Sequence, residues 1–209
     1  MPGAGSASSC VVPLVVANML QIWRGSTLSN FVGRFGLMFA GVILGSIGVQ
    51  NIQGTHADTL GLYICIASLL AALTFFLFGT PRLTARSERW CSPLVGVCTG
   101  AFFGASFGAA FPGILYLKML KLTRDELVQA LGSLFFVCAV AWLGRSRALD
   151  VEVNGLSSSV WLVIPAGVGL LFGYALRREV EDRDYDRWFA CGLLFVAASV
   201  LTCSLAKFS

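Results

Sequence analysis

The chain has 209 residues, of which 56% are hydrophobic and only 12% are charged, and its mean hydropathy is +0.79. A soluble domain carries about twice that share of charge. The composition therefore excludes an ordinary soluble domain and predicts an all-α polytopic membrane protein with about seven hydrophobic segments. The net charge of +4 comes from residues between the apolar runs, so it concerns orientation in a bilayer, and no nucleic-acid partner is expected.

The first apolar segment, at about 9–23, is short for a membrane span and carries Asn18 and Gln21. These two amides share a helix face because they are three residues apart. Polar side chains in a span usually face the bundle interior. We interpret them either as hydrogen-bonding groups that join helices or as groups that contact a solute.

Two further apolar segments follow, at about 31–50 and 58–78. The former contains Gly41-x-x-x-Gly45, a helix face on which another backbone can approach closely. A polar stretch at 81–92 is predicted to be a connecting loop.

The most distinctive stretch is 93–121. Glycines recur there at four-residue spacing and a proline follows four residues later: Gly96, Gly100, Gly104, Gly108 and Pro112. This spacing puts the glycines on nearly one helix face. Because Pro112 lacks a backbone donor and disfavours helix at Phe111, we predict two half-helices, about 93–104 and 112–121, joined by a loosened segment. Such a broken or re-entrant helix is a candidate transport site, and the alternative is a kinked, tightly packed helix without a ligand.

Three more apolar segments are expected at about 125–144, 158–176 and 188–206. Thr123 and Glu126 have capping-box spacing at the start of the first of them. Gln129 and Ser133, four residues apart, share a face of its first two turns. All eleven acidic residues lie outside the apolar runs or at their ends, so no carboxylate within a span is expected to relay protons.

An internal repeat relates the two parts of the chain. Gly41-x-x-x-Gly45 recurs 128 residues later as Gly169-x-x-x-Gly173. We therefore predict an incomplete first repeat at 1–80 and a second at 93–209, the remnant of a 4+4 helix arrangement. The first repeat has no counterpart of the glycine stretch before residue 9, and we interpret this as truncation in preference to loss of that copy.

Several residues together carry a family resemblance: the glycines of 93–121 with Pro112 and Tyr116, residues 120–131 (LKLTRDELVQAL), and Pro165 with the second glycine pair. On these residues the chain resembles the sulfite exporter TauE/SafE family, also called toluene-sulfonate uptake permeases, from that family's second span onward. The resemblance implies eight helices in two repeats and transport of small anions, chiefly sulfur oxyanions and organosulfonates. Phe111 departs from the pattern, which has glycine before the proline, and its ring is expected to narrow or reshape the site.

An anion is best bound by N–H donors and a positive helix end, without competing negative charge. We therefore expect the site at the start of the second half-helix, with neutral donors from neighbouring spans. The expected substrate-binding residues are Gly104, Ser106, Gly108, Pro112, Asn18, Gln21, Gln129 and Ser133. The expected partners are the lipid bilayer, a small anion and other copies of the chain, with no cofactor and no metal.

Two other function classes compete with transport. A non-transporting membrane scaffold or assembly subunit, including a truncated and inactive transporter, would explain the close-packing glycine faces. An intramembrane enzyme is disfavoured, because the sequence has no HExxH, no GxSxG and no paired acidic residues within a span.

The orientation of the chain depends on how 93–121 crosses the bilayer. A full crossing divides the fifteen Lys and Arg eight to seven between the two sides, whereas a re-entrant stretch divides them twelve to three. The positive-inside rule favours the re-entrant form. The eight spans implied by the family resemblance favour a full crossing.

Overall fold

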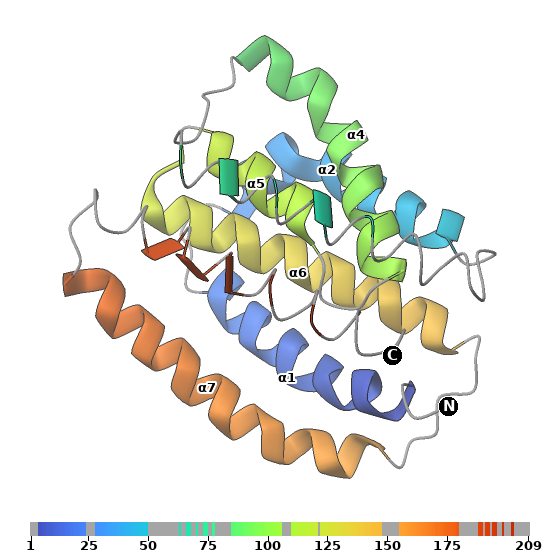
Figure 1. Cartoon of the computed structure of the whole chain (residues 1–209), viewed down its shortest axis with the longest axis vertical. Helices are drawn as coiled ribbons and strands as arrows, with labels where there is room; N and C mark the ends of the chain where they lie inside the picture. Colours follow the sequence, from blue (N-terminus) through green and yellow to red (C-terminus); the bar gives the residue numbers. More distant parts are fainter. Residues whose placement is uncertain are drawn as a thin grey trace.

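The computed structural model of the chain is helical throughout the part that it describes (Figure 1). The described residues are 4–23, 28–49, 85–105, 110–120, 122–147 and 155–179, with isolated positions between 63 and 77 and between 188 and 202. Among them are the helices α1 (Ala4–Trp23), α2 (Leu28–Gly48), α4 (Ala85–Ala105), α5 (Phe111–Met119), α6 (Arg124–Arg147) and α7 (Gly155–Glu179), and no strand. The all-α class is confirmed. The apolar segments expected at 58–78 and 188–206 lie mostly outside the described residues.

Helix α6 is central to the bundle. It packs against α1, α2, α4 and α5, whereas α7 lies at one edge and packs against α1 (Figure 1). The buried apolar core is shared by four helices, with Phe35, Met38 and Val42 from α2, Phe103 from α4, Tyr116 and Leu117 from α5, and Leu127, Leu134 and Cys138 from α6. The short helix α5 is thus held inside the bundle by its neighbours α4 and α6.

The contact between α2 and α4 is made by glycines on both helices. A Cβ added at Gly41 would lie 2.6 Å from the carbonyl oxygen of Pro93, and one added at Gly45 would overlap the carbonyl oxygen of Val97. In return, a Cβ at Gly96 or Gly100 would overlap a backbone carbonyl of α2. Each of the four glycines therefore faces backbone, and the two helices touch main chain to main chain.

Helix α4 begins earlier than the sequence suggests. The polar residues 81–92, predicted to be a connecting loop, are helical from Ala85 onward, and Pro93 lies inside the helix. Ala85 and Glu88 are good helix formers. Packing against α2 also supports the first two turns, which offsets the backbone hydrogen bond that Pro93 cannot make. The capping box predicted for α6 is present: the Thr123 N–H donates to Glu126 Oε2 (2.7 Å) and the Glu126 N–H donates to Thr123 Oγ1 (3.3 Å).

Helices α4 and α5 form an antiparallel hairpin. The interruption lies where the sequence predicts it, with α4 ending at Ala105 and α5 beginning at Phe111. A Cβ at Gly113 would lie 3.0 Å from Thr99 Oγ1, and Tyr116, one turn later in α5, donates to the carbonyl oxygen of Glu88, much earlier in α4. Later residues of α5 therefore contact earlier residues of α4, so the two helices run antiparallel.

Apolar side chains lie on the outer faces of the described helices as well as in the core. Large apolar side chains are exposed on the outer faces of the long helices, among them Met19, Leu44, Leu94, Trp161 and Phe172. Five uncharged polar side chains are buried instead: Asn18, Ser46, Ser92, Thr99 and Gln129. One described helix, α6 from Arg124 to Gly144, is long and apolar enough to cross a membrane. Shorter apolar stretches are Pro13–Trp23, Gly33–Gly48 and Trp161–Ala175.

The glycine contact predicts opposite effects for two alanine substitutions in α2. Gly45→Ala should lower the free energy of unfolding by about 1–3 kcal/mol, because its Cβ meets backbone that cannot yield. Gly36→Ala is the control: nothing described lies within 4 Å of its Cβ, and the loss of glycine flexibility should stabilise the helix by about 0.5–1 kcal/mol. Thermal or denaturant unfolding in detergent measures both, and equal shifts would contradict the proposed main-chain contact.

Candidate functional site

The N-terminal end of α5 is buried, and its N-cap residue, Ala110, provides no side-chain cap. Ala110 at the N-cap and Phe111 are almost inaccessible to solvent, and Pro112 contributes no N–H. The first backbone hydrogen bond of the helix runs from the Ile114 N–H to the carbonyl oxygen of Ala110 (3.1 Å). The N–H groups of Phe111 and Gly113 therefore have no acceptor within α5, and they form the positive end of its dipole.

Thr99 and Leu134 enclose this helix end. Thr99 is completely buried, and its hydroxyl donates to the carbonyl oxygen of Val95 (2.7 Å). A Cβ at Gly113 would lie 2.6 Å from Leu134 Cδ2 and 3.0 Å from Thr99 Oγ1. A larger residue would fit here only if the side chains of Leu134 and Thr99 shifted, because α4 and α6 both approach α5 at this point. Sequence analysis did not select Gly113, although it directly follows Pro112.

Six of the eight predicted binding residues are among those that the structure describes. Gly104 lies in the last turn of α4, and Pro112 in the first turn of α5. Ser106 and Gly108 lie outside the described residues. The other four, Asn18, Gln21, Gln129 and Ser133, lie on α1 and α6.

Asn18 and Gln21 pack against Gly132 of α6. A Cβ at Gly132 would lie 2.9 Å from Gln21 Oε1 and 3.5 Å from the carbonyl oxygen of Asn18. The buried Asn18 amide donates to the carbonyl oxygen of Leu14 in its own helix (2.6 Å). Gly132 is thus a point of close contact between α1 and α6. In the sequence, the feature that could have indicated this residue is its position directly before the predicted binding residue Ser133.

Gln129 differs from its neighbours because its donor is unused. The Ser133 hydroxyl donates to the carbonyl oxygen of Gln129 (2.9 Å), a bond within α6 that satisfies the serine. The side chain of Gln129 is 3% exposed, and its Nε2 has no hydrogen-bond partner among the described residues. A buried donor left in this state destabilises a fold by about 1–3 kcal/mol. Among the described predicted binding residues, Gln129 is therefore the one with a buried N–H donor, Nε2, that no described group accepts from.

The structure does not gather all these residues around one point. Gly132 faces α1, whereas Leu134 faces the start of α5. Residues two positions apart on an α-helix, such as Gly132 and Leu134, are rotated by about 200° around its axis. Asn18 and Gln21 consequently lie on a different side of α6 from the N-terminal end of α5, and Gln129, three residues before Gly132, shares the side that faces α1.

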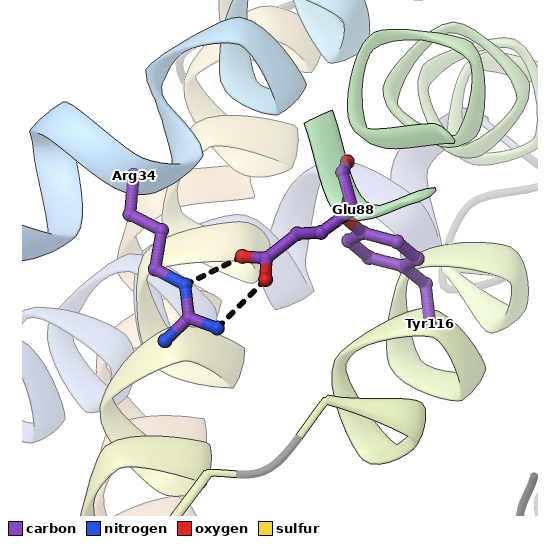
Figure 2. Close-up of polar contacts among 3 residues, drawn as sticks. All are labelled: Arg34, Glu88 and Tyr116. Atoms are coloured by element: carbon purple, nitrogen blue, oxygen red, sulfur yellow. Dashed lines mark hydrogen bonds and ion pairs between the residues drawn. The ribbon is translucent and has the colours of Figure 1, made fainter. Parts of the chain in front are cut away.

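A polar cluster that sequence analysis did not select joins three helices (Figure 2). Arg34 of α2 donates from Nε to Glu88 Oε1 (2.5 Å) and from Nη2 to Glu88 Oε2 (2.9 Å). The backbone carbonyl of the same Glu88, in α4, accepts a hydrogen bond from the Tyr116 hydroxyl of α5 (2.9 Å). We call Arg34, Glu88 and Tyr116 the Glu88 clamp. The sequence signal for it was Arg34, a charge inside an otherwise apolar segment.

Comparison of the chain with protein-family models, with characterised proteins and with solved structures found no match. The functional assignment therefore depends on the residues and geometry described above.

The contact around Gly113 makes a prediction about coupled substitutions. Gly113→Ala should destabilise the fold by about 1–3 kcal/mol, because the added Cβ meets Leu134 and Thr99. Leu134→Ala removes one of the two obstacles, so the double variant should lose less stability than the sum of the single losses, by about 0.5–3 kcal/mol.

The control pairs Leu134→Ala with Gly144→Ala, a position where nothing described lies within 4 Å of an added Cβ. These two changes should add. A double-mutant cycle from unfolding in detergent measures both pairs, and additive losses at Gly113 and Leu134 would show that the two residues are not in contact.

Proposed function

We propose that this chain is a multi-pass membrane protein that transports small anions, with sulfur oxyanions or organosulfonates as the substrate class. The observation that carries the proposal is the buried, uncapped N-terminal end of α5 at the turn of the α4–α5 hairpin. Helix N-termini bind anions through free N–H groups and the helix dipole. In transporters such ends belong to discontinuous helices.

The surface of the bundle supports a multi-pass arrangement. A bilayer solvates the exposed apolar side chains of α1, α2, α4 and α7, which water would not. Helix α6 meets the length and hydropathy of a span by itself. Helices α1, α2 and α7 have 20, 21 and 25 residues. Their described apolar stretches, Pro13–Trp23, Gly33–Gly48 and Trp161–Ala175, are shorter than the roughly 20 residues that cross the hydrocarbon core.

The buried polar groups favour an anion over a cation. Among the described residues they are amides and hydroxyls, and none is acidic. Gln129 adds a neutral donor with no hydrogen-bond partner among the described residues, on the same side of α6 as Gly132, where α1 packs. A neutral donor binds an anion at a smaller desolvation penalty than a buried charge would. The export of one negative charge from a negative-inside compartment is favoured by a free energy of about 2.3 kcal/mol per 100 mV. This driving force fits facilitated export.

The hairpin supports the re-entrant orientation. Because α5 returns along α4, helices α4 and α6 begin at the same end of the bundle, where Arg34 interacts with both Glu88 and Glu126. The basic residues at that end include Arg34, Arg86, Arg89, Lys118 and Arg124. The positive-inside rule then assigns this end to the cytoplasmic side.

A non-transporting scaffold is the second candidate. Asn18 and Ser133 hydrogen-bond within their own helices, and the glycines of α2 and α4 are filled by backbone. These features stabilise a bundle without a ligand. Flux distinguishes the two functions: the purified chain in liposomes should release entrapped sulfite faster than protein-free liposomes, and equal rates would favour the scaffold.

Gln129→Met should raise stability and reduce transport together. Methionine keeps the volume but removes the unpaired amide, so the free energy of unfolding should rise by about 1–3 kcal/mol. Sulfite flux should fall, because the anion loses a donor. Ser46→Ala is the matched control, since Ser46 is also buried but its hydroxyl donates to the carbonyl oxygen of Ile43 (3.0 Å). Unchanged flux in Gln129→Met would remove Gln129 from the site.

The proposed orientation places the start of α4 and the end of α6 on opposite sides of the membrane. Single cysteines at Arg89 and Gly144, both exposed, would test it in a background without the seven native cysteines. A membrane-impermeant maleimide added to sealed vesicles should label only one of the two. Labelling of both from the same side would instead indicate that 93–121 crosses the bilayer completely.

A further inference from the structure

We propose that Tyr116 is a positioning residue for the anion site, acting through its hydrogen bond to the backbone of Glu88. This inference rests on the proposed function, because the element that Tyr116 positions is the α5 helix whose N-terminal end would bind the anion. The bond fixes how far α5 reaches back along α4, and it thereby fixes the depth at which the N–H groups of Phe111 and Gly113 are presented.

The first step of the argument is that α4 is itself held in place at Glu88. The Glu88 carboxylate is 14% exposed and is bound by two nitrogens of Arg34, from the neighbouring helix α2. Two parallel bonds of this kind restrict orientation as well as distance. The start of α4 is therefore a fixed reference point against which α5 can be positioned.

The second step is that Tyr116 connects α5 to this reference point. Tyr116 is 3% exposed, and its hydroxyl donates to the Glu88 carbonyl oxygen at 2.9 Å (Figure 2). Tyr116 is one helical turn from Gly113, where α5 meets Thr99 and Leu134. In a helix of nine residues, one turn separates the polar tether from the proposed anion site, so a shift at Tyr116 moves that site almost rigidly.

The third step is that Tyr116 makes the hydrogen bond by which α5 is joined to α4 among the described residues. Lys118, on the same helix, lies instead over the ring of Phe189, 4.9 Å from Nζ to the ring centroid. At the C-terminal end of α5 the Leu120 N–H bonds back to the carbonyl oxygen of Leu117 (3.3 Å). The close approach of Gly113 to Leu134 and Thr99 limits how far α5 can move, and the Tyr116 hydrogen bond, which depends on distance and direction, selects one register of the hairpin within that limit.

Tyr116→Phe tests this inference in the full chain, reconstituted in liposomes. The readout of position is the labelling rate of Cys91, which lies in α4 about one turn after Glu88, the residue that Tyr116 binds. The other six cysteines are replaced so that Cys91 alone reacts. The loss of one hydrogen bond, typically worth about a two- to tenfold change in an equilibrium, should raise the Cys91 labelling rate severalfold.

Transport kinetics provide the second readout. Tyr116→Phe should raise the KM for sulfite by about two- to tenfold, with a smaller change in maximal rate, because fewer molecules present the binding-competent register. Glu88→Gln keeps the backbone acceptor but weakens the Arg34 pair, so it should raise Cys91 labelling less. Tyr174→Phe on α7, a helix that packs against α1, is the matched control and should change neither readout.

The outcomes separate this inference from the proposed function. Unchanged Cys91 labelling in Tyr116→Phe overturns the inference, whatever the flux. Increased labelling with an unchanged KM also overturns it, since Tyr116 would then stabilise the hairpin without positioning a site. If the unsubstituted chain passes no sulfite, the proposed function fails, and a simultaneous rise in Cys91 labelling would still show that Tyr116 holds α5 to α4.

Discussion

The main-chain contact between α2 and α4 is the constraint on which the rest of the bundle depends. Gly41 and Gly45 lie against carbonyl oxygens of α4, and Gly96 and Gly100 lie against carbonyl oxygens of α2. No larger residue fits at these four positions without separating the helices. The contacts advance together along both helices, from Gly41 against Pro93 to Gly45 against Val97, so the helices run parallel in a single register. That register brings Arg34 of α2 within hydrogen-bonding distance of Glu88.

The fixed start of α4 has a consequence for the hairpin. Glu88 accepts bonds through two different groups, its carboxylate from Arg34 and its backbone carbonyl from Tyr116. One residue therefore links α2, α4 and α5. The short helix α5 is placed between α4 and α6 with its uncapped N-terminal end buried. A buried helix end with N–H groups not bonded within the helix is the chemical feature that makes an anion the preferred ligand in the proposed function.

The polar residues inside the bundle, buried except for the half-buried Ser133, differ in how they use their hydrogen-bonding groups. Asn18, Thr99 and Ser133 donate to carbonyl oxygens of their own helices, one turn earlier. These bonds satisfy the side chains without help from a neighbouring helix or a solute. Gln129 is also buried, yet its amide donor has no partner among the described residues. This contrast is the physical reason to select Gln129, among the four predicted polar residues on α1 and α6, as the group with a donor left for an anion.

The sequence by itself determined the helical class, the position of the break between α4 and α5, and the close-packing role of the glycines in α2 and α4. These features depend on local chemistry: apolar runs, the missing N–H of Pro112, and a four-residue glycine spacing that matches the helical period. The second glycine pair, Gly169 and Gly173, meets no described atom within 4 Å of an added Cβ. Only the tertiary structure decided which helix each glycine faces, that α5 turns back along α4, and that Asn18 and Gln21 lie on a different side of α6 from Pro112. Those facts depend on pairing between segments far apart in the chain, which periodicity within one segment does not specify. The Glu88 clamp was also decided only by the tertiary structure. Arg34 and Tyr116 are separated from Glu88 by 54 and 28 residues in the sequence, and Arg34 reaches Glu88 because the glycines allow α2 and α4 to touch.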